Sequence, residues 1–432
     1  MFNKICVIGM GYIGLPTAST FAIHGLQVVG VDNNPAVLEA LNAGRVHIQE
    51  PGLRALAEQA FSSGNLRLSR EPEPADAFII AVPTPATPRV KGGADPTAEL
   101  GSVVAASQAL LPHLRPGNLV MLESTCPPRT TLDLVAPILE RSGLRAGVDF
   151  LLAYSPERVL PGRILQELIE NARVIGGVTP ASAEAGRELY ALFVRGEIVL
   201  TDATTAEMVK LMENTSRDVS IAIANEFARL AEHVGVDVWE AIAMANRHPR
   251  INILRPGPGV GGHCVSVDPW FLVQADPEQA RLIRTARQVN DDQPLHSVRL
   301  VERALGSLQG RKVAALGLAY KPDVDDLRES PALEVARLLA VRGAEVWTHE
   351  PYAPERTATG ARAAGSLEEA LTGAQAVVLL VDHKAFRELE PAQAAAAMSG
   401  RIAVDLRGVW QPAAWDAAGF SLHTLGVGIP RA

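Results

Sequence analysis

A glycine- and proline-rich stretch, residues 256–270 (PGPGVGGHCVSVDPW), delivers one cysteine, Cys264, to the start of a predicted helix. Such residues do not sustain a helix or a central strand, so we expect a shaped loop whose backbone can approach a ligand closely. Asp268 and Pro269 suit the N-cap and first position of the helix that follows. A thiol beside glycines at a helix entrance is a candidate nucleophile, because exposure and positive potential raise its thiolate fraction. The alternative is a small buried hydrophobic residue, the usual role of a lone free cysteine.

A second candidate site, for a dinucleotide, lies near the N-terminus. Residues 9–14 (GMGYIG) separate a strand-like ICVIG from a helix-like LPTASTFAIHG, and Asp32 ends the next strand-like run. In this context Gly9 allows the tight turn, Gly11 lets the backbone approach a pyrophosphate, and Gly14 permits close packing of helix and strand. Asp32 would bind the ribose hydroxyls and repel a 2'-phosphate, which favours NAD over NADP. The alternative is an ordinary turn between a strand and a helix.

Polar residues also follow three further predicted strands, at residues 78–82, 119–124 and 150–155. Strands that alternate with helices predict a doubly wound parallel sheet, whose ligands bind at the carboxyl ends of the strands. Thr84 and Thr125 would place hydroxyls there, and Glu157 with Arg158 forms a polar pair in a proline-bounded loop. Ordinary turn chemistry is the alternative for each threonine, and a solvated turn is the alternative for the charged pair.

A long helix is predicted from residue 204 to residue 233. A polar line at Lys210, Asn214 and Arg217 shares one side of it, and His248 and Arg250 come just before the glycine loop. A solvated helix face and a basic turn are the alternatives for these two sets. The helix also has a broad apolar face that we expect to be buried, as in a helix that bridges two domains or two subunits. That face comprises Met208, Leu211, Met212, Val219, Ile223, Phe227 and Leu230.

The first strand–helix–strand pattern returns in outline at residues 311–350. Its connecting loop (LAYKPDVDDLRES) lacks the later glycines, so a second domain of this kind would not bind a whole dinucleotide. Tyr320, Lys321 and Arg328 lie in that loop, and Arg407 follows a later strand; a nucleotide diphosphate would explain the basic residues. Pairing with Asp325 or Asp326 is the alternative for Arg328. We therefore predict an α/β fold of two Rossmann-like, doubly wound parallel-sheet domains joined by a central helical domain with a long helix.

Composition excludes several classes of protein. The 432 residues, 47% of them hydrophobic, suffice for two or three cores. The net charge of −8 argues against a nucleic-acid binder. No apolar run approaches the ~18 to 20 residues that span a bilayer, and no signal-type segment precedes the first strand. The three cysteines have no metal-ligand spacing and suit a reducing compartment, so we expect no metal, no disulfide and a cytoplasmic location.

Short motifs along nearly the whole chain resemble those of the UDP-glucose/GDP-mannose dehydrogenases. They are, in order, GMGYIGLP, DNNP, EPGL, VPTP, ESTCPP, SPERVLPG, EMVKLMENTSRD, RHPRINIL, PGPGVGGHCVSVDPW, GLAYKPDVDDLRESP and DLRG. The resemblance implies an NAD-binding domain (1–200), a central helical dimerisation domain with the catalytic loop (201–305) and a UDP-sugar-binding domain (306–432). It also implies a homo-oligomer, at least a dimer through the central helices, in which Arg250 or Arg407 can act on the neighbouring subunit's site.

The resemblance further implies a four-electron oxidation of a nucleotide sugar. NAD removes a hydride from the C6 alcohol, Cys264 captures the aldehyde, a second NAD takes the second hydride, and the thioester is hydrolysed to the uronic acid. Lys210 would transfer protons and stabilise the oxyanion with Asn214, Asp268 and Thr125 would handle the water, and Glu157 would assist hydrolysis. Implied substrate contacts are Arg158, Val159, Lys210, Asn214, Arg217, His248, Arg250, Gly261, Tyr320, Lys321 and Arg407. Implied NAD contacts are Gly9, Gly11, Tyr12, Ile13, Gly14, Asp32, Thr84, Thr125 and Arg328.

Residues at two positions indicate which UDP-sugar would be the substrate. Family members that act on UDP-glucose usually have Glu where this chain has Pro161, and tend to have Lys where it has Val267. Both departures resemble the branch that acts on UDP-N-acetyl-D-mannosamine and supplies cell-surface polysaccharide synthesis. UDP-N-acetylglucosamine, UDP-N-acetylgalactosamine and UDP-glucose stay open as alternatives, because one substituent is worth only a few kcal/mol of pocket contacts.

Two other classes of function use many of the same residues. A two-electron reductase of the 3-hydroxyacid type would need the NAD fold and a helix Lys and Asn, but would have no use for Cys264. A non-catalytic nucleotide-sugar binder would keep the basic residues and tolerate loss of the thiol. The number of NADH formed per sugar separates these hypotheses from the four-electron oxidation.

Overall fold

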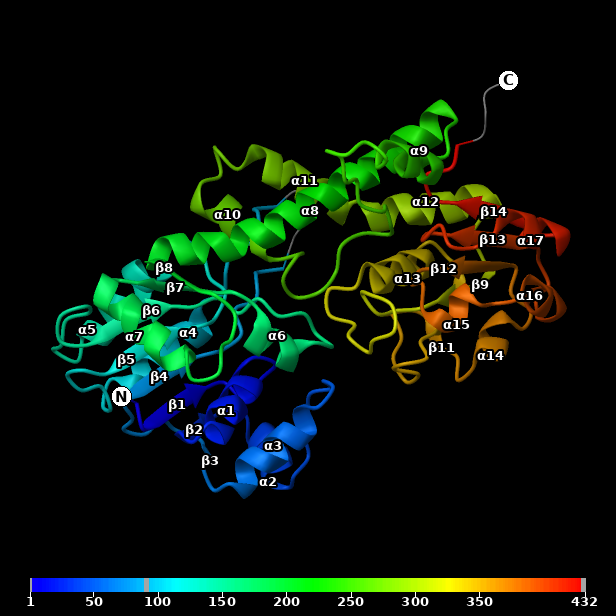
Figure 1. Cartoon of the computed structure of the whole chain (residues 1–432). Helices are drawn as coiled ribbons and strands as arrows, with labels where there is room; N and C mark the ends of the chain where they lie inside the picture. The colour runs from blue at the N-terminus through cyan, green and yellow to red at the C-terminus, as the bar shows by residue number, and fades with distance from the viewer. Residues whose placement is uncertain (1, 89–92, 429–432) are drawn as a thin grey trace. The chain divides into compact units, whose positions relative to one another are not determined.

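The computed structural model describes residues 2–88 and 93–428 of the chain (Figure 1). These residues form two compact units. The first runs to Glu213 and also includes Trp270–Gln279, and the second comprises Asn214–Pro269 and the chain from Ala280 onward. Among the residues described, no helix combines the length and apolarity needed to cross a bilayer.

The first unit is built on a sheet with the strand order β3-β2-β1-β4-β5-β6-β7-β8. The strands are β1 (Lys4–Ile8), β2 (Gln27–Val31), β3 (Leu66–Ser69), β4 (Ala77–Ile80), β5 (Leu119–Leu122), β6 (Leu151–Tyr154), β7 (Arg173–Gly177) and β8 (Ile198–Asp202). The first six strands in this order, from β3 through β2, β1, β4 and β5 to β6, run parallel, as predicted. The pairing of β6 with β7 is antiparallel, so β7 and β8 reverse the direction of the sheet.

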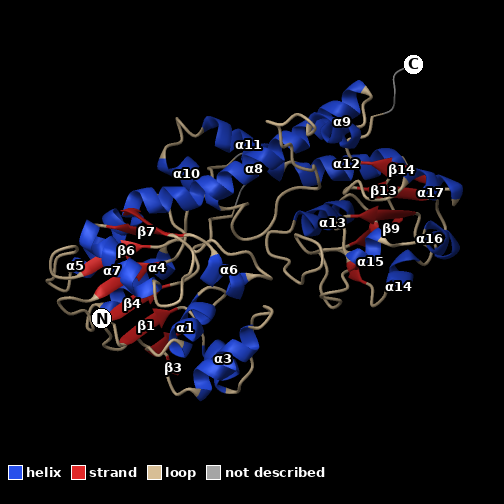
Figure 2. Cartoon of the chain, in the orientation of Figure 1, coloured by secondary structure: helices blue, strands red, loops and turns tan. Residues whose placement is uncertain are grey.

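Helices cover both faces of this sheet (Figure 2). They are α1 (Gly14–Ile23), α2 (Pro35–Asn42), α3 (Leu53–Ser62), α4 (Gly101–Leu110), the π-helical turn η1 (Thr131–Val135), α5 (Ala136–Glu140), α6 (Ile164–Glu170) and α7 (Pro180–Tyr190). Alternate residues of one strand enter opposite cores: Ile5 and Val7 pack with α1 and α7, whereas Cys6 and Ile8 pack with α4 and α5. Burial on both faces explains why the central strands β4 (AFII) and β5 (LVML) contain only apolar residues.

The second unit contains a parallel sheet with the strand order β11-β10-β9-β12-β13-β14. Its strands are β9 (Lys312–Leu316), β10 (Glu345–His349), β11 (Arg362–Ala363), β12 (Ala376–Leu379), β13 (Ile402–Asp405) and β14 (Ser421–Thr424). The covering helices are α12 (Gln293–Leu305), α13 (Pro331–Val341), α14 (Leu367–Leu371), α15 (Lys384–Arg387), α16 (Pro391–Ala397) and α17 (Pro412–Ala417). Two apolar cores lie on its two faces. The two sheets with their helices confirm the predicted fold class.

Between the two sheets in the sequence lie α8 (Ala203–Val234), α9 (Val238–Ala245), α10 (Asp268–Ala275) and α11 (Arg281–Asp291). Helix α8 corresponds to the predicted long helix. Its predicted buried face is mostly wrong within a single chain: Leu211 is buried, but five of the seven named residues are exposed. Those five are Met208, Met212, Ile223, Phe227 and Leu230. The period of 3.6 shows which residues share a face, but it does not show which element, or which molecule, covers that face.

Candidate active site

The turn between β1 and α1 has the geometry of a dinucleotide-binding turn. Gly9 has φ +99°, and a Cβ there would lie 2.4 Å from the Ala81 carbonyl oxygen. A Cβ at Gly14 would lie 1.7 Å from the Gly9 carbonyl oxygen, so both glycines are required by the protein's own packing. A Cβ at Gly11 would meet no atom within 4 Å. The open space beside Gly11, at the N-terminus of a helix, fits the pyrophosphate of NAD.

Asp32 follows β2, as the dinucleotide fingerprint requires. One carboxylate oxygen accepts the Met10 N–H at 2.9 Å and the other accepts the Asn34 N–H at 2.8 Å. Asp32 therefore joins the end of β2 to the glycine turn and presents a fixed negative charge beside it. Tyr12 and Ile13 occupy that turn, with Ile13 at the N-cap of α1. These residues fit NAD and disfavour a 2'-phosphate.

Thr84 and Thr125 follow the neighbouring strands β4 and β5. The Thr84 hydroxyl donates to the Thr125 carbonyl oxygen at 2.5 Å, which joins the two loops at the carboxyl edge of the sheet. The Thr125 segment has a second anchor in Glu207, a buried residue of α8 whose carboxylate accepts from the backbone N–H groups of Arg129 and Thr131. The structure thus brings the two threonines together in the first unit.

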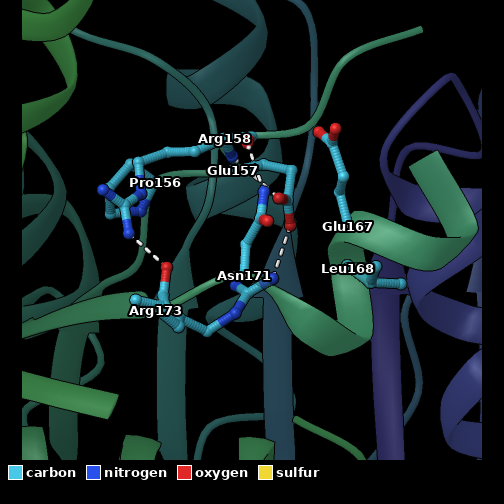
Figure 3. A pocket seen from close by; sticks show the side chains of 8 residues that line it. Pro156, Glu157, Arg158, Glu167, Leu168, Asn171 and Arg173 are labelled. Carbon is cyan, nitrogen blue, oxygen red and sulfur yellow. Dashed lines mark hydrogen bonds and ion pairs between the residues drawn. The ribbon is translucent and has the colours of Figure 1, made fainter. Parts of the chain in front are cut away.

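The loop after β6 meets α8 at Lys210. The Lys210 ammonium donates to the Glu157 carbonyl oxygen at 2.8 Å and is 8% exposed. One oxygen of the Glu157 carboxylate accepts the Arg158 N–H at 2.7 Å, and the other pairs with Arg173 (Figure 3). Arg158 pairs with Glu213 of α8 at 2.5 Å. The first unit thus holds Lys210, Glu157 and Arg158 together.

A small pocket, with a cavity volume of about 10 Å³, adjoins this loop (Figure 3). Its lining is Pro156, Glu157, Arg158, Glu167, Leu168, Asn171, Ala172 and Arg173. Several side chains hold the loop in place: Glu50 accepts the N–H groups of Gly162 and Ile164, and Glu167 accepts the N–H of Leu160. Val159 packs against the apolar core. The EPGL motif that contains Glu50 is therefore an anchor for the predicted substrate loop.

In the second unit, the glycine loop packs against the segment that follows β9. A Cβ at Gly261 would lie 2.6 Å from the Glu329 carbonyl oxygen and 2.8 Å from the Tyr320 Cβ. Gly262 has φ +86° and donates its N–H to the Arg328 carbonyl oxygen. Both positions require glycine, the first for its close packing and the second also for its backbone conformation. The close approach predicted for this loop is made to the protein's own chain at Tyr320.

Cys264 lies at the end of that loop, just before α10. Its side chain is neither buried nor fully exposed, and its Sγ lies 2.7 Å from the Nδ1 of His263. The Cys264 carbonyl oxygen accepts the N–H groups of Val267 and Asp268, which begins the turn into α10. Asp268 is buried, and its carboxylate accepts the Asn214 side-chain amide at 2.5 Å. The second unit thus contains the thiol, an imidazole in contact with it, and the Asp268–Asn214 pair.

A second small pocket, with a cavity volume of about 10 Å³, lies in the second unit. Its lining is Pro258, Gly259, Ala319, Tyr320, Lys321, Pro331, Ala332, Leu380, Val381 and Arg407. Three of the predicted substrate residues, Tyr320, Lys321 and Arg407, therefore share one pocket. Arg407 is held by an ion pair of 2.9 Å with Asp382.

The remaining predicted contacts lie elsewhere in the second unit. Arg217, His248 and Arg250 are solvent-exposed. Arg328 pairs with Asp326 at 2.6 Å, which is the alternative considered for it from the sequence. Two residues near the candidate site were not predicted from the sequence, His263 and Arg173. The available signal for His263 is its place directly before Cys264, whereas Arg173 begins a strand, β7, that was not predicted from the sequence.

Comparison with known proteins gives matches along most of the chain. The UDP-glucose/GDP-mannose dehydrogenase family matches with its NAD binding domain at residues 3–194, its central domain at 204–292 and its UDP binding domain at 314–412.

Individual relatives cover nearly the full length. An NDP-N-acetyl-D-galactosaminuronic acid dehydrogenase of Ralstonia solanacearum is 47% identical, over 95% of this chain and 96% of its own. A UDP-N-acetyl-D-mannosamine dehydrogenase of Methanococcus maripaludis is 44% identical, over 99% of this chain and 97% of its own. The structure of the UDP-N-acetyl-D-mannosamine dehydrogenase from Pyrococcus horikoshii superposes with a TM-score of 0.90 at 41% identity, covering 98% of this chain and 99% of that one.

Proposed function

Because this chain belongs to the UDP-glucose/GDP-mannose dehydrogenase family, we propose that it oxidises UDP-N-acetyl-D-mannosamine to UDP-N-acetyl-D-mannosaminuronate and forms two NADH per sugar. The observation that carries this proposal is the accessible Cys264 thiol, in contact with an imidazole at the entrance of α10. A two-electron dehydrogenase would not need that thiol, and a binding protein would not need the imidazole beside it. The product would supply the synthesis of a cell-surface polysaccharide.

In this proposal, each step of the reaction is assigned to particular residues of the chain. NAD, when bound, accepts one hydride in each of the two oxidations. Lys210 takes the proton that leaves the C6 hydroxyl, and the resulting aldehyde is attacked by the Cys264 sulfur. The second oxidation converts this thiohemiacetal into a thioester. Water oriented by Asp268 and Thr125, with the aid of Glu157, then releases the acid and regenerates the thiol.

Asn214 stabilises the oxygen that becomes negative during attack, together with Lys210. Its amide already donates to Asp268, which fixes the amide in one orientation. Substrate contacts in this proposal are Arg158, Val159, Arg217, His248, Arg250, Gly261, Tyr320, Lys321 and Arg407. NAD contacts are Gly9, Gly11, Tyr12, Ile13, Gly14, Asp32, Thr84, Thr125 and Arg328.

The identity of the sugar is the part of the proposal for which an alternative has the most support. UDP-N-acetylgalactosamine is the second candidate, and the 47% identical relative from Ralstonia solanacearum favours it. Pro161 and Val267 resemble the UDP-N-acetylmannosamine branch and disfavour UDP-glucose. The test is NADH yield and kcat/KM for UDP-N-acetylmannosamine, UDP-N-acetylgalactosamine, UDP-N-acetylglucosamine and UDP-glucose. Two NADH per UDP-N-acetylmannosamine at the highest kcat/KM supports the proposal. One NADH per sugar supports a two-electron reductase, and sugar binding without NADH supports a binding protein.

We also propose that the enzyme forms at least a dimer through α8, whose exposed apolar residues would become buried against a second copy. Basic residues such as Arg250 would then serve the neighbouring site. A cytoplasmic location is part of the same proposal, since three cysteines without metal-ligand spacing suit a reducing compartment.

A further inference from the structure

A closed cluster of charged side chains surrounds Arg173, the first residue of β7. The guanidinium forms an ion pair with Glu157, donates to the Ser155 hydroxyl at 3.0 Å and lies 3.3 Å from Glu123. Tyr190 of α7 donates its hydroxyl to Glu123, and its ring centroid lies 4.2 Å from the Arg173 guanidinium carbon. The side chains of Arg173, Glu157 and Glu123 are all less than 10% exposed.

Stability alone gives no reason for charges at this place. Replacing a buried ion pair by well-packed apolar groups is often neutral or stabilising, because desolvation of the charges offsets their attraction. The cluster also contains two carboxylates for one guanidinium, so it is not charge-balanced when both are ionised. The planar fork of arginine, however, reaches two partners with fixed geometry, which a lysine or an apolar residue cannot do.

Those two partners lie at the ends of the short segment from Ser155 to Glu157, where the chain leaves β6. Arg173 holds the Ser155 side chain with one nitrogen and the Glu157 side chain with the other. The second Glu157 oxygen accepts the Arg158 N–H, so the carboxylate is fixed on both sides. The Glu157–Arg158 peptide, whose N–H is held by that carboxylate, presents the Glu157 carbonyl oxygen to the Lys210 ammonium at 2.8 Å.

We propose that Arg173 is a positioning residue for the reaction: by holding Ser155 and Glu157, it fixes the carbonyl oxygen that orients the Lys210 amine. This inference rests on the proposed function, in which Lys210 transfers the proton of the C6 hydroxyl. Among the interactions of the described residues, no hydrogen bond or ion pair joins Arg173 to Lys210, so Arg173 acts through Glu157. Misplacing a reacting group by about 1 Å can cost about 100-fold in rate, so a residue of this kind acts on kcat.

The test compares the wild-type enzyme with Arg173→Lys and with the double variant Arg173→Met/Glu123→Gln, which removes one charge of each sign from the cluster and leaves Glu157 in place. The Tm of each variant is measured, to establish that it is folded at the assay temperature. We expect kcat to fall by about 10-fold in Arg173→Lys and about 100-fold in the double variant. The KM values for sugar and NAD should change by less than about threefold, and the pH–kcat profile should shift because it reports the protonation of groups acting in catalysis.

A matched control is Ile79→Ala, which creates a cavity in the core of the same sheet. It should lower Tm without moving the pH–kcat profile. If the Arg173 variants behave like Ile79→Ala, with lower Tm and an unmoved profile, the positioning role is refuted.

A second readout does not depend on turnover. Acetic anhydride labelling of Lys210, followed by mass spectrometry, should be faster in Arg173→Lys than in wild type, because the amine has lost its fixed acceptor. An unchanged labelling rate overturns the positioning role. Failure of the wild type to form two NADH per sugar refutes the proposed function instead, so the two failures are distinguishable.

Discussion

At the scale of single residues, the three cysteines differ in ways that decide their chemistry. Cys6 lies in the core of β1, and burial raises the pKa of its thiol to about 11. Cys126 is also buried. Cys264 is accessible and in contact with the His263 ring, which can accept its proton. Reactivity follows the thiolate and its exposure, so Cys264 has the environment of a nucleophile.

Replacement of that sulfur should separate binding from oxidation. We expect Cys264→Ser to form no uronic acid and to lose at least about 1,000-fold in kcat, while it still binds UDP-sugar and NAD. NADH absorbance and anion-exchange chromatography of the product measure this. Cys6→Ala is the control and should keep two NADH per sugar with a lower Tm. Acid formation by Cys264→Ser at a rate near wild type would exclude a thioester mechanism.

The glycines of the first turn allow a second test at residue scale. We expect Gly11→Ala to leave the Tm of the protein without ligand unchanged, because a Cβ there meets no atom within 4 Å. It should weaken NAD binding by about 10-fold or more, because the methyl group would occupy the pyrophosphate space. Calorimetry with NAD and thermal melts measure the two effects. Gly14→Ala is the contrast, since its Cβ would clash with Gly9 and lower Tm. Unchanged NAD affinity in Gly11→Ala would argue against a dinucleotide at this turn.

At the scale of elements, α8 shows which properties of a helix its sequence pattern predicts and which it does not. Its polar residues Lys210 and Asn214 both make the hydrogen bonds of the candidate site, although a solvated face was the alternative. Its apolar residues were predicted to be buried and are mostly exposed. The difference has one cause: a pattern gives the direction of a side chain, whereas the covering partner comes from tertiary or quaternary structure.

The dimer proposal belongs to this element. We expect Phe227→Glu and Leu230→Glu each to shift the oligomer to monomer in light scattering, because a charge buried in an apolar interface is strongly unfavourable. Activity should fall with dissociation if basic residues serve the neighbouring site. Val341→Glu on α13 is the control, since that side chain is also exposed but lies on another helix. A wild-type monomer, or variants that remain dimeric, would exclude α8 as the interface.

Other elements could not be predicted. The antiparallel direction of β7 relative to β6 could not be predicted from the sequence. A strand that is buried on both faces has the same apolar pattern whether it runs parallel or antiparallel to its neighbour. The π-helical turn Thr131–Val135 also has no compositional signal. Cys264, the glycine turn and three residues of the second pocket, Tyr320, Lys321 and Arg407, could be named as candidates from the sequence. The anchors Glu50 and Arg173 could not, because only the fold brings them to the loop they hold. The predicted boundaries at residues 200 and 305 stay a prediction.

At the scale of the whole molecule, the cluster around Arg173 links the candidate site to stability. Burial, and then the Glu157 carboxylate, raise the pKa of Glu123 from 4.5 to about 7, against the opposing effect of Arg173. The folded protein therefore holds this proton more tightly than the unfolded chain does. Its contribution to stability is fully present below about pH 4.5 and is lost as the pH rises through about 7.

We expect Glu123→Gln to remove this loss. Each pKa unit corresponds to about 1.4 kcal/mol, so wild type should lose on the order of 2 to 3 kcal/mol relative to the variant between about pH 5 and pH 8. Chemical denaturation at both pH values measures the difference. Glu184→Gln on the surface of α7 is the control, because its pKa is lowered by Arg187 and it stays ionised over this range. Parallel pH dependences for wild type and Glu123→Gln would show that Glu123 does not titrate there.

The two sheets also differ in what closes their first turn. In the second unit Glu350 occupies the position after β10 that Asp32 has after β2, but its carboxylate accepts the N–H groups of both Leu318 and Ala319 and contacts the buried His383. The Leu318 N–H has the place that the Met10 N–H has in the first turn, where it is bonded to Asp32. The Ala319 N–H has the place of Gly11, and in the second unit it is bonded to Glu350 as well. The second turn is therefore closed by the chain's own carboxylate at the position where the first turn is open at Gly11, and we expect only the first turn to accept the pyrophosphate of a dinucleotide.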